Sequence, residues 1–140
     1  MKARILFFFL TVLIFFRFSE TFGQNAILTG MEQSLLLNLE SDPKIQIKVT
    51  STTINNVDKV YYGIGTKENS IDIISLTSDI TVYEGKVFLK SASGSFEEIT
   101  GRDLYLPIPF NDIDLIGKFL TVYLVNKDGS FSNKLSIPAK

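Results

Sequence analysis

The sequence predicts an all-β protein, an antiparallel two-sheet sandwich of about seven to nine strands. Short runs of β-branched and aromatic residues recur along the chain after residue 40, and turn residues separate them. Several runs alternate apolar with polar side chains, as a strand with one buried face does. No segment after residue 24 keeps a long helical period, so the crossover helices of a parallel sheet are not expected.

The first strand is expected to follow a short linker. Leu28 and Met31 begin a roughly helical spacing of apolar residues, but Gly30 lies between them. We therefore interpret 24–33 as an N-terminal linker and 34–140 as a single β-sandwich domain.

Clear alternation begins with the strand predicted at 44–50. Ile45, Ile47 and Val49 share one face, and the residues between them are polar. Lysines flank this run and the later run at 86–91, which we interpret as protection of sheet edges; they are Lys44, Lys48, Lys86 and Lys90.

The next predicted strand, 59–66, contains two glycines. Val60, Tyr62 and Ile64 share one face, while Gly63 and Gly65 leave the other face nearly bare. A bare face in a strand indicates a bulge or a close approach of another backbone.

The middle of the chain is divided into several short strands. The segments 71–76 and 80–83 are predicted as two strands, and the second is joined to 86–91 through Glu84-Gly85, with the glycine supplying a positive φ. After a loop at 91–95, we expect strands at 96–100 and 104–108. Pro107 and Pro109 cannot donate to a ladder, so the latter strand should lie at an edge.

The chain closes with a predicted hairpin. The segment 119–125 is dense in β-formers, 126–130 is a turn with Asp128-Gly129 at its centre, and 131–137 is the returning strand.

Residues 115–133 around this hairpin resemble the end of a fibronectin type III domain. The resemblance rests on Leu115, Gly117 and Phe119, on the alternating strand, and on the run from Asp128 to Asn133. It implies an immunoglobulin-like sandwich and no particular activity. Phe119 stands where that family has a corner tyrosine, and it lacks the hydroxyl. Tyr61 or Tyr62 is expected to fill the core position of the family's tryptophan.

The N-terminus has the order of a secretory signal peptide. A basic start with Lys2 and Arg4 precedes twelve almost wholly apolar residues, 5–16, and then the polar stretch 17–23. Twelve helical residues rise only about 18 Å, too short for a bilayer core of about 30 Å. The alternative, an uncleaved anchor, is therefore disfavoured. We predict cleavage after residue 23 and export to the periplasm or the cell surface.

The C-terminal end of this predicted signal peptide also suggests a source. A signal that ends in Phe-Gly before Gln24 resembles the signals of exported Bacteroidota proteins, some of which consist of a signal peptide and one immunoglobulin-like domain.

Composition excludes several kinds of chemistry. The chain has no Cys and no His, so disulfides, thiol nucleophiles, Ser-His-Asp triads and most zinc or haem sites are excluded. Removing residues 1–23 leaves 11 basic and 14 acidic residues, a net charge of −3. No basic patch is visible, so we expect no nucleic-acid binding.

Three motifs invite a chemical interpretation. Asp112 and Asp114 could bind calcium, or could only form local turns, because the EF-hand spacing is missing. Glu97 and Glu98 are neighbours in a predicted strand and should point to opposite faces, which argues against a glycosidase pair. The stretch 63–66 lacks the lysine and helix of a phosphate-binding loop, so we interpret it as strand geometry.

Four aromatic residues fall out of phase with the apolar faces: Tyr61, Tyr83, Phe88 and Tyr105. They form either a binding stripe or, as we favour, scattered β-formers.

Together these observations predict an exported, non-enzymatic binding module that acts by protein or glycan contact at the cell envelope. We assign no catalytic, cofactor or metal residues. We expect a monomer without stable membrane insertion after signal cleavage. The alternatives are a calcium-stabilised adhesion domain and a carboxylate-dependent hydrolase.

Overall fold

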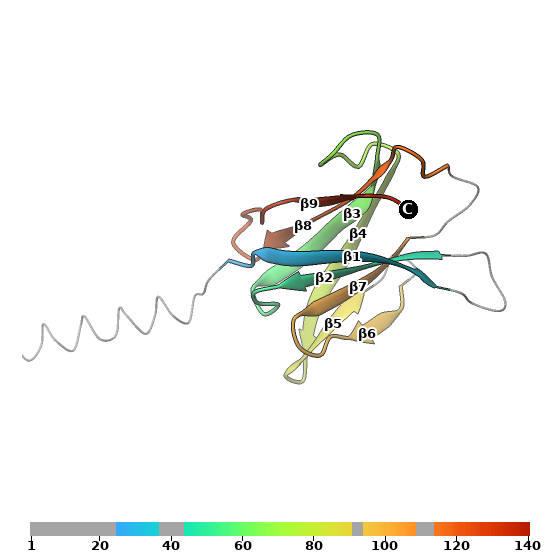
Figure 1. Ribbon diagram of the computed structural model, residues 1–140. Coiled ribbons are helices and arrows are strands. Elements are labelled where there is room, and N and C mark those ends of the chain that lie inside the picture. The colour runs from blue at the N-terminus through green and yellow to red at the C-terminus, as the bar shows by residue number, and fades with distance from the viewer. Residues whose placement is uncertain (1–24, 37–43, 91–93, 109–113) are drawn as a thin grey trace, which may run out of the picture.

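The computed structural model describes residues 25–36, 44–90, 94–108 and 114–140 as an all-β sandwich (Figure 1). In this part of the chain nine strands form two antiparallel sheets. The strands are β1 (Leu28–Leu36), β2 (Lys44–Ser51), β3 (Val57–Gly65), β4 (Ile74–Tyr83), β5 (Lys86–Lys90), β6 (Phe96–Glu98), β7 (Asp103–Ile108), β8 (Phe119–Asn126) and β9 (Leu135–Pro138). The predicted fold class is confirmed, while the predicted signal peptide, 1–23, lies outside the described residues.

The two sheets differ in size. The smaller has the order β1-β2-β7, and the larger has the order β6-β5-β4-β3-β8-β9. β7 lies at an edge, as Pro107 predicts. In the described residues we find no helix with the length and hydrophobicity to span a bilayer.

The core lies between the sheets and is built by alternation. Ile45, Ile47 and Val49 of β2 are buried, as predicted. Tyr62 is the buried member of the tyrosine pair in β3, whereas Tyr61 faces outward. The hydroxyl of Tyr62 lies 3.3 Å from Ser78 Oγ and donates to the Pro107 carbonyl at 3.4 Å, so it links the two sheets. Burial raises the pKa of this hydroxyl, which therefore remains a donor.

β1 begins at Leu28, inside the segment 24–33 that we predicted as a linker. Two distant asparagine side chains hold its start. Asn126 Oδ1 accepts from the Ala26 N–H at 3.0 Å. Asn133 accepts from the Leu28 N–H at 2.8 Å and donates to the Leu28 carbonyl at 2.9 Å. Each amide takes the place of a neighbouring strand, which local sequence does not reveal.

β4 is one strand where we predicted two. It runs through Ser78, which is buried and is satisfied by the Tyr62 hydroxyl. Residues 71–73 precede the strand. The Asp72 carboxylate accepts from the N–H and the hydroxyl of Thr66 at 2.8 and 2.7 Å and from Ser70 Oγ at 3.0 Å. These bonds, the Thr66 hydroxyl first, lower the pKa of Asp72 to about 2.

The returning segment of the last hairpin is also shorter than predicted. Phe131 forms only an isolated bridge to Val125, and regular pairing resumes with β9. Between them, Ser132 Oγ accepts the Leu124 N–H at 2.8 Å, so a side chain replaces a ladder bond. The predicted turn is confirmed, with Gly129 at φ 87°.

Our interpretation of four lysines as edge protection was wrong. Lys44 and Lys48 belong to β2, and Lys86 and Lys90 to β5, and each of these strands has a neighbour on both sides. A strand's position within a sheet depends on pairing between distant segments, which a flanking charge cannot report.

The β4–β5 hairpin turns through the two residues predicted, but both have a positive φ, 50° at Glu84 and 77° at Gly85. This is the geometry of a type I′ turn, which favours Asn-Gly. A left-handed backbone costs a residue with a Cβ about 1–2 kcal/mol, and asparagine tolerates it best.

We therefore expect Glu84→Asn to stabilise the protein by about 1 kcal/mol, measured by urea denaturation. Glu68→Asn is the matched control, because Glu68 is exposed in a loop and is not among the residues with positive φ. The control should change stability by less than about 0.5 kcal/mol. An equal effect of both substitutions would contradict the turn assignment.

Candidate functional site

The outer face of the six-stranded sheet carries most of the exposed aromatic side chains. Cross-strand partners share a face, so the register defines which residues lie together. One row across the sheet contains Val125, Lys59, Asp79, Lys90 and Phe96. The rows beside it place Tyr123 with Tyr61, and Thr81 with Phe88 and Glu98.

The aromatic rings on β3 and β8 mostly cover one another. Tyr61 and Tyr123 are stacked, with centroids 5.1 Å apart and an interplanar angle of 11°. Phe131 meets Tyr123 edge-on at 5.9 Å, and Lys134 Nζ lies 5.2 Å from the centre of the Tyr123 ring. The Tyr61–Tyr123 contact is that of a cross-strand ladder that stabilises the sheet, whereas Phe131 remains 69% exposed.

A second aromatic group, on β4, β5 and β6, is open to solvent. Thr81, Val82, Tyr83, Phe88 and Phe96 line a shallow hollow of about 460 Å³. We call it the β4–β6 hollow. Tyr83 is 67% exposed and Phe96 is 61% exposed, values far above those of core aromatics. The hollow is therefore a preformed apolar surface of the size that small ligands occupy.

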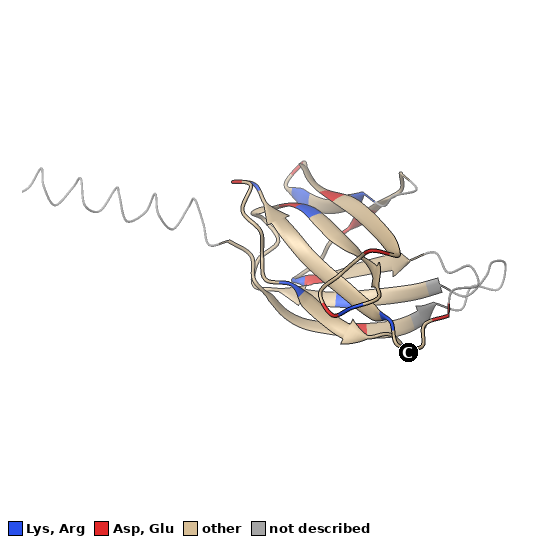
Figure 2. Cartoon of the chain, turned by 90° about the horizontal axis from the view of Figure 1, so that it is seen from above, with Lys and Arg blue, Asp and Glu red and all other residues tan. Residues whose placement is uncertain are grey.

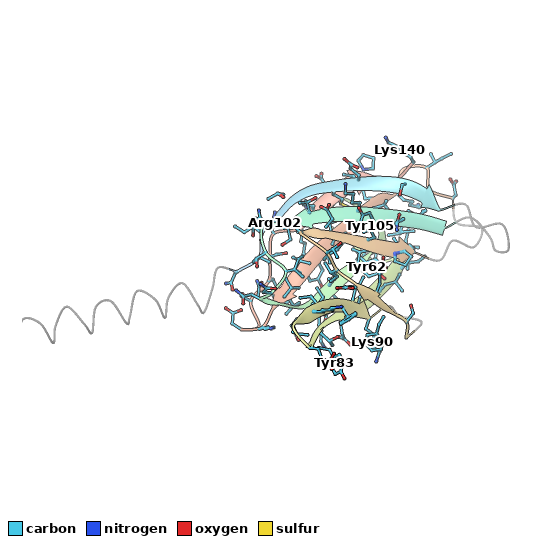
Figure 3. The ribbon with its side chains drawn as sticks, turned by 90° about the horizontal axis from the view of Figure 1, so that it is seen from below. Tyr62, Tyr83, Lys90, Arg102, Tyr105 and Lys140 are labelled. Carbon is cyan, nitrogen blue, oxygen red and sulfur yellow. The ribbon has the colours of Figure 1, made fainter. Side chains whose placement is uncertain are left out.

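The rings of Tyr83, Phe88 and Phe96 stay uncovered because they lie on the outer face of the larger sheet, which points away from the smaller sheet. The inner face is also exposed at this end, because the smaller sheet has only three strands and β5 and β6 continue past β7 at its edge (Figure 1). Val82 belongs to the same face of β4 as the buried Ile80, yet it is 55% exposed. Figure 3 shows Tyr83 and Lys90 at this end of the larger sheet.

Charged side chains surround the hollow. Lys90 Nζ lies 5.8 Å from the centre of the Phe96 ring, a cation–π distance. Lys86 pairs with Tyr83 at the end of the hairpin, and Glu98 pairs with Phe88. Acidic and basic residues are interspersed over the whole described chain (Figure 2).

The aromatic residues singled out in the sequence divide between the two sheets. Tyr61, Tyr83 and Phe88 lie on the outer face of the larger sheet, but Tyr105 lies on β7 in the smaller one (Figure 3). Sequence reasoning missed Phe96, the most exposed phenylalanine of the hollow. The sequence does contain a pattern that indicates an exposed position, since Phe96 begins a short predicted strand and is followed by two glutamates.

The remaining sequence candidates do not form a site. Asp114 Oδ1 accepts the Ile116 N–H at 2.9 Å, which is a local turn, and Asp112 lies outside the described residues. Glu97 pairs with Leu89 and Glu98 with Phe88, so the two carboxylates lie on opposite faces, as predicted. Across the ranges that the structure describes, no three acidic side chains are grouped to hold a metal ion.

The glycines of 63–66 serve the strand geometry that we predicted. A Cβ on Gly63 would lie 1.8 Å from the Ile74 carbonyl oxygen, and one on Gly65 would lie 2.0 Å from that of Ser70. Both glycines therefore permit a close backbone approach.

Comparison with known proteins finds no relative. No protein-family model matches the chain, and neither the curated proteins nor the solved structures contain a significant match. The site must therefore be interpreted from its own geometry.

Proposed function

We propose that this protein is an exported, non-enzymatic module of the immunoglobulin-like type that binds a protein or a glycan at the cell envelope through the β4–β6 hollow. The observation that carries the proposal is the exposure of Tyr83 and Phe96 beside Phe88 in one hollow. Exposed, clustered aromatic rings are costly in water and are typical of binding surfaces.

The strand order supports the immunoglobulin-like assignment. In that fold strands A, B and E form one sheet, and C, F and G lie together in the other. Here β1-β2-β7 and β3-β8-β9 have the same arrangement in chain order. β4, β5 and β6 extend the second sheet beyond β3, and they carry the hollow. The extension would thus add a binding surface to a common framework.

The test compares capture from a cell-envelope fraction by the protein and by variants. We expect Tyr83→Ser with Phe96→Ser to lose the captured component, because the double change removes the exposed rings. Tyr105→Ser is the matched control, since Tyr105 is an exposed tyrosine on the other sheet, and it should retain capture. Equal capture by the double variant would contradict the proposal. Circular dichroism of each variant checks that it is folded.

A further inference from the structure

The outer face of the larger sheet is locally cationic. The register, together with the contact of Lys134 with Tyr123, places four lysines on this face: Lys59, Lys86, Lys90 and Lys134. Asp79 and Glu98 lie there by the same pairings, and a third carboxylate, that of Asp58, is exposed beside Lys59 at the bulge of β3, so the lysines exceed the acidic residues by one. The chain without its predicted signal carries a net charge of −3, so this excess of positive charge is local.

Two of these lysines border the β4–β6 hollow. Lys86 and Lys90 lie on the same face of β5, on either side of Phe88, and Glu98 lies across from Phe88 in the row between them. They are four positions apart in the strand, so their backbone positions are about 14 Å apart at roughly 3.4 Å per strand residue. Asp79 lies across from Lys90, but it also lies across from Lys59 on its other side, so one carboxylate faces two cations.

Exposed aromatic rings with lysines beside them match the chemistry of an acidic sugar chain. A sugar ring presents apolar C–H groups that pack on aromatic rings, and a uronate or sulfate group presents an anion to a lysine. Extending the proposed function, on which this inference rests, we propose that the β4–β6 hollow binds an acidic polysaccharide. Phe88, Phe96 and Tyr83 contact the sugar rings, and Lys86 and Lys90 pair with the anionic groups.

Two other occupants fit the surface less well. Glu84 lies at the tip of the hairpin that carries Tyr83, and a carboxylate there opposes insertion into a bilayer. A second copy that paired antiparallel along the free edge of β6, with the twofold axis at the middle residue of this three-residue strand, would set Glu97 against Glu97 of the other chain. Like charges directly opposite each other destabilise a strand pair.

The experiment is affinity gel electrophoresis of protein expressed from the full-length gene. The gels contain dextran sulfate, neutral dextran or polygalacturonate. Dextran sulfate and dextran share one backbone and differ in charge. We expect retardation by both acidic polymers and none by dextran.

Variants separate specific binding from ion exchange. Lys86→Gln with Lys90→Gln should weaken binding at least tenfold, and so should Tyr83→Ser with Phe96→Ser. The controls are Lys48→Gln and Tyr105→Ser, which make single changes of the same kind on the outer face of the smaller sheet and, alone or combined, should alter binding less than twofold.

Several results would overturn the inference. Binding that depends on the lysines but not on the rings would be ion exchange. Equal retardation by dextran, or binding that depends on the rings but not on the lysines, would rule out an acidic ligand while leaving the proposed function intact. If none of the three polymers retards the protein, but envelope capture still depends on Tyr83 and Phe96, an acidic polysaccharide is likewise ruled out and the proposed function stands. Binding to phosphatidylglycerol vesicles without binding to either acidic polymer would indicate a membrane surface instead.

Discussion

Gly63→Ala is expected to destabilise the protein by about 3 kcal/mol or more, at or beyond the upper end of the range for overpacking. The new Cβ would lie 1.8 Å from the Ile74 carbonyl oxygen and 2.8 Å from its carbonyl carbon. Both atoms belong to the backbone, so no side chain can rotate away. The contact is relieved only if β3 and β4 separate where Gly63 pairs with Ser75.

Gly30→Ala is the matched control for this substitution. A Cβ on Gly30 would meet nothing closer than Thr50 Cβ, at 3.9 Å, which is an ordinary contact. We expect a change of less than about 1 kcal/mol, with stabilisation favoured because alanine restricts the unfolded chain. Urea midpoints with unchanged slopes measure both variants. A loss of less than about 1 kcal/mol in Gly63→Ala would contradict the close approach of the two strands.

Tyr62→Ala should cost about 3–5 kcal/mol, the range for truncating a large buried aromatic side chain. Tyr62 is 1% exposed and lies in the centre of the larger sheet, between β4 and β8. Its loss leaves a cavity between the sheets and also removes the hydroxyl that contacts Pro107 in the smaller one.

Tyr62→Phe separates the ring from the hydroxyl. The hydroxyl contacts are long, at 3.3 and 3.4 Å, so we expect this variant to lose only about 0.5–1.5 kcal/mol. Tyr61→Ala provides the comparison within the same strand. Tyr61 lies on the outer face, and its loss should cost clearly less than that of Tyr62. Equal costs for Tyr61→Ala and Tyr62→Ala would contradict the assignment of Tyr62 to the core.

Strand positions in this protein follow closely from local pattern. The alternation of Ile45, Ile47 and Val49 identified β2, and Glu84-Gly85 located the hairpin turn. These features are decided by side-chain period and by backbone preference at a few residues. The side-chain period and the backbone preference can both be recognised in the sequence without knowing which strands pair with one another.

The candidate site was predicted only in part for a physical reason. Whether an aromatic residue is exposed depends on what covers it, and coverage depends on pairing between distant strands. Tyr105 and Tyr83 are both out of phase with their apolar neighbours, yet they lie on different sheets. The ring of Phe96 became part of the hollow only when β6 paired with β5.

By itself the sequence determined the all-β class, most strand positions, the turns and the absence of cysteine and histidine chemistry. Those properties depend on residue type and on spacing within a few residues. Only the tertiary structure decided that β1 starts at Leu28, since its first amides are bonded by Asn126 and Asn133, about a hundred residues away in the chain. It also decided that β5 lies inside the sheet and that Tyr83, Phe88 and Phe96 gather on its outer face, because pairing between distant segments determines which side chains lie together and which of them face the other sheet.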